Sequence, residues 1–148
     1  MTQGKRNIII DIICGILLLL FFYSAISKFY DHERFQYILS RTILLKHFPN
    51  IASWVIPITE IILSTLLFRP VTRQKGLYGS LFLLSTFTLF LVYMLLFSRG
   101  DMPCSCGGVI SKMTWQQHIV FNIFFIALSI AGIYLNKTNL TFGKRTPP

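Results

Sequence analysis

The stretch IIIDIICGILLLLFFYSAISKF, residues 8–29, decides the fold class of this 148-residue chain. It is about 22 residues long and carries only two charged side chains, and roughly 17 to 25 apolar residues let a helix cross the hydrocarbon core of a bilayer. Lys5 and Arg6 precede it, as in a secretory signal, but the apolar core of a signal has only about 7 to 15 residues. We therefore expect a membrane anchor that is retained.

Three further apolar stretches, residues 51–68, 77–97 and 119–135, also have lengths suited to membrane-spanning helices. Hydrophobic residues make up 53% of the chain and charged residues 13%, with a mean hydropathy of +0.62, whereas soluble domains contain roughly 25% charged residues. Alternating strand patterns are absent, and a helix satisfies its own backbone hydrogen bonds in lipid. The sequence predicts an all-α polytopic membrane protein, a single domain over residues 1–148 that forms a four-transmembrane-helix bundle.

The segment 30–50, between the first two spanning helices, has the pattern of an amphipathic helix. Apolar residues recur at helical spacing and polar residues fall between them: Phe35, Ile38, Leu39, Thr42 and Leu45 on one side, and Arg34, Gln36, Arg41 and Lys46 on the other. This pattern predicts an outer interfacial helix. Such a helix would either cap the bundle or offer a docking surface for a soluble partner.

The distribution of basic residues predicts the orientation of the bundle. With a cytoplasmic N-terminus, eight Lys and Arg residues fall inside and six outside, and three of the eight lie in the short turn 69–76. We expect a bacterial inner (cytoplasmic) membrane protein with both termini cytoplasmic and the loop before residue 119 extracytoplasmic. The formal net charge of +9 then reflects topology and contact with anionic lipid, and we expect no nucleic acid partner.

Two acidic residues lie inside the predicted spans. Asp11 is about one turn from the inner surface, where a basic residue of the turn 69–76 would pair with it. Glu60 follows Pro57 near the middle of the second span, where an ionised side chain costs roughly 3 kcal/mol. Burial favours the neutral form of such a carboxyl unless a cation is near. Two interpretations of Glu60 stay open: a neutral structural carboxyl bonded to Ser or Thr, or a proton or quinone site.

Two groups of polar residues share helix faces near the outer surface. Ser24 and Lys28 are four residues apart in the first span, and Lys28 either reaches water at the interface or serves a function. His118 and Asn122 form a similar pair at the start of the fourth span. A histidine there is either an interfacial hydrogen-bonding residue or a catalytic one.

The loop before the fourth span contains Cys104-Ser105-Cys106-Gly107-Gly108, two closely spaced thiols in an oxidising compartment if the predicted topology holds. A bridge between them would close a very small ring, and strain makes a disulfide easier to reduce. Redox exchange, soft-metal binding and a structural role all remain open for this pair. Cys14, in the first span, is expected to be a buried apolar side chain about 20 Å from the outer surface, too far to exchange with the pair.

Three motifs resemble the methylamine-utilisation MauE family and the wider DoxX-like group of four-helix membrane proteins. They are Ser24-Ala25-Ile26-Ser27-Lys28-Phe29, Pro57-Ile58-Thr59-Glu60 and Pro103-Cys104-Ser105-Cys106-Gly107-Gly108. The family often has Cys-X-Cys-Phe-Gly, so Gly107 departs from its pattern. The resemblance implies a redox-associated inner-membrane protein, similar to one needed for the maturation of an extracytoplasmic protein that carries many disulfides.

These observations predict a protein that exchanges thiol and disulfide equivalents between an extracytoplasmic thiol protein and the quinone pool. Cys104 and Cys106 are the expected exchanging pair, and Glu60, Lys28 and His118 are candidates for a quinone or proton site. The chain has no second pair of reactive cysteines, so a quinone or a partner protein must supply the other half. The alternatives are a carrier for a soft metal such as Hg or Cu, and a non-catalytic assembly factor or subunit of a larger membrane complex.

Overall fold

The computed structural model of the chain describes residues 3–42, 45, 47–97 and 114–143. All regular elements in this part of the chain are helices: α1 (Gln3–Tyr30), α2 (His32–Arg41), α3 (Pro49–Phe68), α4 (Arg73–Phe97) and α5 (Trp115–Gly143). Four of them, α1, α3, α4 and α5, are long and apolar enough to cross a membrane. The predicted all-α fold with four spans is therefore confirmed, and the chain is a multi-pass membrane protein.

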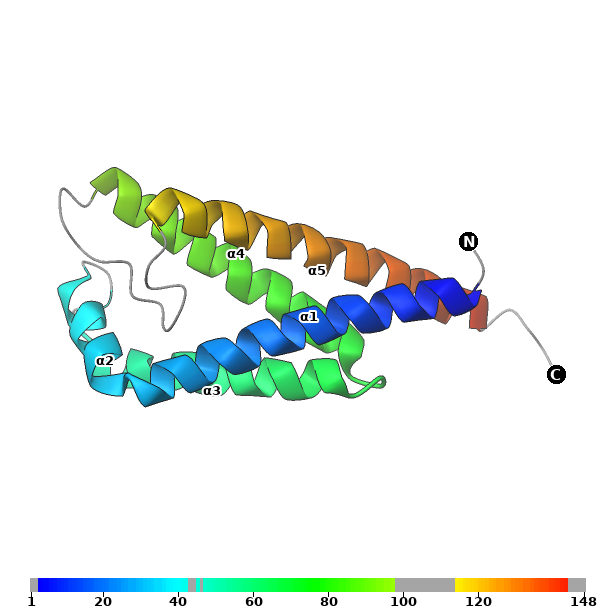
Figure 1. The fold of residues 1–148 in the computed structure, drawn as a ribbon, viewed down its shortest axis with the longest axis horizontal. Helices are drawn as coiled ribbons and strands as arrows, with labels where there is room; N and C mark the ends of the chain where they lie inside the picture. Colours follow the sequence, from blue (N-terminus) through cyan, green and yellow to red (C-terminus); the bar gives the residue numbers. More distant parts are fainter. Residues whose placement is uncertain (1–2, 43–44, 46, 98–113, 144–148) are drawn as a thin grey trace.

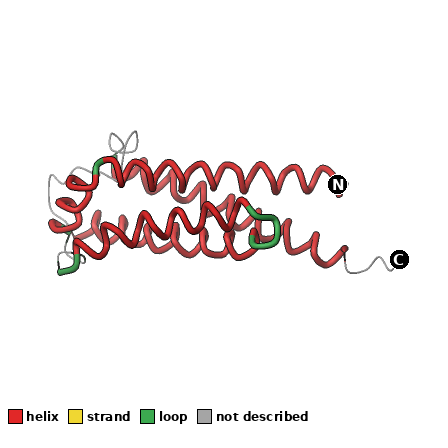
Figure 2. The backbone as a smooth tube through the Cα atoms, turned by 90° about the horizontal axis from the view of Figure 1, so that it is seen from below, coloured by secondary structure: helices red, strands yellow, loops and turns green. Residues whose placement is uncertain are grey.

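The four long helices form an antiparallel bundle in which α1 packs against α3 and α5, and α4 packs against the same two helices. The start of α1, the end of α5 and the α3–α4 turn lie at one end, which we call the turn end (Figures 1 and 2). The short helix α2 lies across the other end, the α2 end. Towards the α2 end the α4–α5 pair diverges from the α1–α3 pair (Figure 1).

The core is made of aliphatic and aromatic side chains from all four long helices. Its buried members are Ile10, Ile13, Cys14, Leu17, Phe21, Leu63, Leu67, Leu77, Leu84 and Phe125. Large apolar side chains also cover the outside of the bundle, including Leu19, Phe82 and Leu89, each more than 60% exposed in the isolated chain. In a bilayer this outer surface faces lipid, which explains why apolar residues surround each helix.

The helix α2 confirms that the segment 30–50 contains a helix, but it is shorter than the predicted interfacial segment. Phe35 and Leu39 are buried, and α2 packs mainly on α3. The helix ends at Arg41 because Thr42 adopts an extended conformation and its Oγ1 donates to the Leu39 carbonyl at 2.6 Å. The Thr42 N–H donates to the same carbonyl at 3.2 Å, so the residue after the helix supplies two donors to a carbonyl at the helix end.

Side chains of α4 hold the turn end together. Arg73 Nη1 lies 2.6 Å from Asp11 Oδ1 of α1, and Asn136 Nδ2 of α5 donates to Gln74 Oε1 at 2.5 Å. The predicted pairing of Asp11 with a basic residue of the turn is thus confirmed, with Arg73 as its partner. The turn itself is shorter than predicted, because α4 already begins at Arg73.

Candidate functional site

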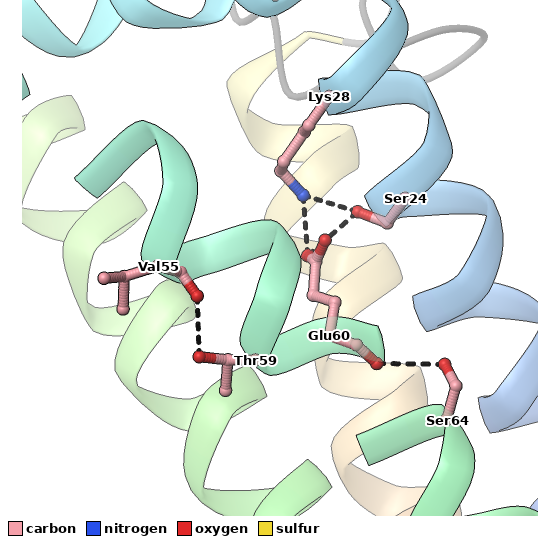
Figure 3. A network of polar contacts seen from close by, with 6 residues as sticks. All are labelled: Ser24, Lys28, Val55, Thr59, Glu60 and Ser64. Atoms are coloured by element: carbon pink, nitrogen blue, oxygen red, sulfur yellow. Dashed lines mark hydrogen bonds and ion pairs between the residues drawn. The ribbon is translucent and has the colours of Figure 1, made fainter. Parts of the chain in front are cut away.

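A buried charged network joins α1 to α3 in the half of the bundle near α2. Lys28 Nζ lies 2.6 Å from Glu60 Oε1 and donates to Ser24 Oγ at 2.5 Å. Ser24 Oγ in turn donates to the same Glu60 oxygen at 3.0 Å. Figure 3 shows the three side chains meeting between the two helices. The i, i+4 spacing places Ser24 and Lys28 on one face of α1, and that face points at α3.

Burial makes this ion pair different from a surface salt bridge. The side chains of Lys28 and Glu60 are 4% and 8% exposed. Taking two charges out of water is costly, and their attraction offsets that cost only when the geometry is good and further hydrogen bonds are made. Lys28 therefore does not reach water at the interface, one of the two interpretations its sequence position allowed. Its long side chain bends into the bundle because Glu60 offers an opposite charge there.

The helix α2 covers the network at the α2 end of the bundle. The ring of Phe35, on the buried face of α2, lies 5.8 Å from Lys28 Nζ, within the range of a cation–π contact. The amphipathic pattern of α2 thus has a specific consequence: its apolar face covers the Lys28 end of the ion pair.

Local features of α3 hold the Glu60 backbone in place. Ser64 Oγ donates to the Glu60 carbonyl at 2.9 Å, one helical turn further along (Figure 3). Pro57 is buried inside the same helix and has no N–H, so the carbonyl of Ser53 lacks its usual i+4 donor. Pro57 therefore removes one backbone hydrogen bond from the turn of α3 that precedes Glu60.

Only one oxygen of Glu60 is used by the network. Lys28 and Ser24 both donate to Oε1, whereas Oε2 is buried and accepts no hydrogen bond from the part of the chain that the structure describes. A buried acceptor without a partner is uncommon, because a polar atom that loses water normally gains another partner. Oε2 is therefore the oxygen available to a ligand.

His118 and Asn122 occupy the start of α5 and are also buried. The helix begins with a reciprocal cap: Thr114 N donates to Gln117 Oε1 at 3.0 Å, and Gln117 N donates to Thr114 Oγ1 at 3.3 Å. The His118 ring lies 5.5 Å from the ring of Phe87 on α4. Asn122 is 3% exposed, and its Nδ2 donates no hydrogen bond within the described residues.

The two residues predicted to exchange disulfides, Cys104 and Cys106, lie outside the described residues. The segment that carries them joins Phe97, at the end of α4, to Thr114, just before α5. Both of these anchor points lie at the α2 end of the bundle, the end that holds Lys28 and His118 (Figure 1). The segment that contains the two cysteines is thus attached to the α2 end of the bundle on both sides.

Cys14 is a buried, free cysteine in the core, as predicted. Fourteen residues of α1 separate it from Lys28, about 21 Å along the helix at a rise of roughly 1.5 Å per residue. Its neighbours in the core are aliphatic and aromatic, and it has no place in the polar network.

The structure thus brings two of the predicted site residues, Lys28 and Glu60, into direct contact and places His118 on a different helix. The contact between Lys28 and Glu60 was not predicted from the sequence. An opposite charge in each of two consecutive spans was the available signal that they pair. The unpartnered atoms of Glu60 and Asn122 had no counterpart in the sequence pattern, because they depend on which atoms face which neighbour.

Comparison with known proteins identifies a protein family. Residues 6–135 match the model of a protein family described as methylamine utilisation protein MauE. No similar curated protein and no similar solved structure was found.

Proposed function

Because the chain belongs to the MauE family over residues 6–135, as its motifs predicted, we propose that it exchanges thiol and disulfide equivalents between an extracytoplasmic partner and membrane quinone. This exchange would support the maturation of an extracytoplasmic protein. The observation that carries the proposal is the attachment of the Cys104–Cys106 segment to the bundle end that also holds the buried Lys28–Glu60 pair. Thiol chemistry and a polar site for protons would then lie at the same membrane face.

The proposed exchange balances in two steps. In the oxidative direction, a partner dithiol reduces the Cys104–Cys106 disulfide and itself becomes a disulfide, with mixed disulfides as intermediates. The resulting Cys104–Cys106 dithiol then gives two electrons and two protons to a quinone, which becomes a quinol. The reverse direction consumes quinol and reduces the partner. The chain has only three cysteines, and Cys14 is about 21 Å from the level of Lys28 along α1, so a relay through cysteines alone is not available.

We further propose that the α2 end is extracytoplasmic and that the membrane is the bacterial inner membrane. The basic turn supports this orientation: Arg69, Arg73 and Lys75 all lie at or next to the turn end. An oxidising compartment at the α2 end would favour the disulfide form of the pair.

Trapping of a mixed disulfide tests the exchange. Cys104→Ala and Cys106→Ala are each expressed in cells, quenched with acid, alkylated and separated on non-reducing gels. Removing the resolving cysteine leaves the attacking thiol bonded to its partner, so one of the two single variants should accumulate a reducible adduct. The double variant should show none.

Cys14→Ala is the matched control, because it removes a cysteine of the same chain that is buried in the core. It should leave the adduct unchanged in a Cys104→Ala or Cys106→Ala background. If neither single variant forms an adduct and the double variant supports normal disulfide maturation, the exchange is refuted. Metal bound by the reduced protein would then favour a soft-metal carrier, and co-purification with a larger complex would favour an assembly factor.

A further inference from the structure

Two buried polar atoms near the α2 end have complementary hydrogen-bonding needs. Glu60 Oε2 is an acceptor and Asn122 Nδ2 is a donor, and neither has a hydrogen-bond partner among the described residues. Their residues are 6% and 3% exposed. Buried polar atoms inside a bilayer cannot form hydrogen bonds with bulk water. A bound ligand could satisfy both atoms by donating to Glu60 Oε2 and accepting from Asn122 Nδ2.

The helix register places the two residues at the same depth. Gly132 of α5 lies against Ile13 of α1, since a Cβ added to Gly132 would sit 3.2 Å from Ile13 Cγ2. Asn122 is ten residues from Gly132, and Ser24 is eleven residues from Ile13, in antiparallel helices. At roughly 1.5 Å per residue both lie about 15 to 17 Å from that contact. Asn122 is therefore level with Ser24, which bonds Glu60.

Asn122 also faces the inside of the bundle. Buried residues of α5 include His118, Asn122, Phe125 and Ser129, which recur at helical spacing on one face. The same face carries Gly132, which meets α1 and α4. Asn122 of α5 and Glu60 of α3 therefore lie at a common level on two different helices of the bundle.

We infer that Glu60 Oε2 and Asn122 Nδ2 are the two polar contacts of a quinone head group at this level, an assignment that rests on the proposed function. A quinol hydroxyl can donate to Glu60 Oε2, and its second oxygen can accept from Asn122 Nδ2. A quinol dissolves in a bilayer and carries both a hydroxyl donor and an acceptor oxygen on one flat ring. The oxidised quinone has two acceptors, so it satisfies Asn122 but cannot donate to Glu60.

This asymmetry gives Glu60 a role in moving the proton. If the Cys104–Cys106 disulfide accepts the two electrons and two protons of a quinol and becomes two thiols, the proton of the hydroxyl that faces Glu60 would leave through Oε2, which does not keep it. When quinone is reduced by the dithiol, the transfer runs the other way. Lys28 and Ser24 keep Oε1 occupied, so Oε2 is the atom that faces the ligand.

Binding of the two redox forms tests the site. The Cys104→Ala/Cys106→Ala protein in nanodiscs is titrated with a short-chain ubiquinol analogue, with its quinone form, and with the menaquinone equivalents. Asn122→Leu should weaken both redox forms about tenfold, because each loses the same hydrogen bond. Glu60→Gln should weaken the quinol about tenfold and leave the quinone at least as tightly bound. Lys28 and Ser24 hold the amide oxygen at the Oε1 position, so the amide N–H takes the place of Oε2 and donates to a quinone carbonyl.

Ser129→Ala is the matched control, since Ser129 lies on the same face of α5 and its hydroxyl bonds the Phe125 carbonyl within the helix. It should bind both forms as the parent does. Lys28→Met/Glu60→Gln keeps the experiment decisive if Glu60→Gln alone does not fold, because it removes both charges together. Ser24 can still donate to the amide oxygen in this variant, so the loss of binding should again be larger for quinol than for quinone.

Absence of binding in the parent, or equal loss of both redox forms in the Glu60 variants, would refute the site. Unchanged binding in Asn122→Leu would do so as well. The cysteine-free background separates this result from the proposed exchange. Quinol binding without any trapped adduct would refute the exchange and keep the site, whereas a trapped adduct without quinol binding would do the reverse.

Discussion

At the scale of single residues, Lys28 and Glu60 matter because both charged side chains are buried inside the bundle. An ionised Glu or Lys within a span costs roughly 3 kcal/mol on insertion scales. Together, with Ser24 as a shared partner, they form a pair joined at 2.6 Å. A structural role and a functional role of Glu60 are therefore compatible. The ion pair uses Oε1, and Oε2 stays available for a further hydrogen bond.

A double-mutant cycle of Lys28→Met, Glu60→Gln and the combined variant measures this coupling. Lys28→Met should lower the free energy of unfolding by about 3 to 5 kcal/mol, because Glu60 is left buried without its cation. Lys28→Met/Glu60→Gln should recover most of that loss. Reversible unfolding in mixed micelles is the measurement.

The second ion pair of the bundle supplies the control. Asp11 lies near the turn end and is 60% exposed where it meets Arg73, so Asp11→Asn should cost clearly less than Lys28→Met. If the Lys28→Met/Glu60→Gln protein were as unstable as Lys28→Met, the two residues would not be energetically coupled.

At the scale of elements, glycine sets how closely α3 and α4 approach at the turn end. A Cβ added to Gly76 of α4 would lie 3.0 Å from the backbone nitrogen of Leu67, and the Leu67 side chain is fully buried beside it. Backbone cannot move aside as the tip of a flexible side chain can. The short turn between the helices prevents them from separating to make room.

Gly76→Ala should therefore destabilise the bundle by about 1 to 3 kcal/mol through overpacking. Gly15→Ala is the matched control within a spanning helix, because nothing lies within 4 Å of its added Cβ. It should be neutral or slightly stabilising, since Ala favours helix more than Gly does. Thermal unfolding in one detergent compares the two, and equal midpoints would contradict the close packing of α3 and α4.

At the scale of the whole molecule, the antiparallel bundle separates two chemically different ends. The turn end carries the basic turn and the Asp11–Arg73 pair, and the α2 end carries the buried Lys28–Glu60 network. The segment with Cys104 and Cys106 joins α4 to α5 at the α2 end. The proposed function requires that this end face the extracytoplasmic side.

Labelling of intact cells decides the orientation. After mild reduction of spheroplasts, a membrane-impermeant maleimide should react with Cys104 or Cys106 and leave Cys14 unlabelled, since Cys14 is buried in the core. The Cys104→Ala/Cys106→Ala protein should then show no label. Labelling of the parent only after lysis would place the cysteine segment in the cytoplasm and invert the topology.

The sequence alone determined the four spanning helices, because each depends on the composition of a continuous segment about as long as the bilayer is thick. It also predicted the amphipathic helix before α3, the burial of Cys14 and the pairing of Asp11, and its motifs identified the family. These features depend on residues that are close in the chain, or on a charge beside a short turn.

Only the tertiary structure decided what Lys28 does. Lys28 and Glu60 are 32 residues apart, and their contact depends on how α1 and α3 are rotated and shifted against each other. The hydropathy of either helix says little about that rotation, because both helices are apolar around most of their circumference. For the same reason the depth of Asn122 relative to Glu60 followed from the packing of Gly132 on Ile13 and not from the pattern of α5.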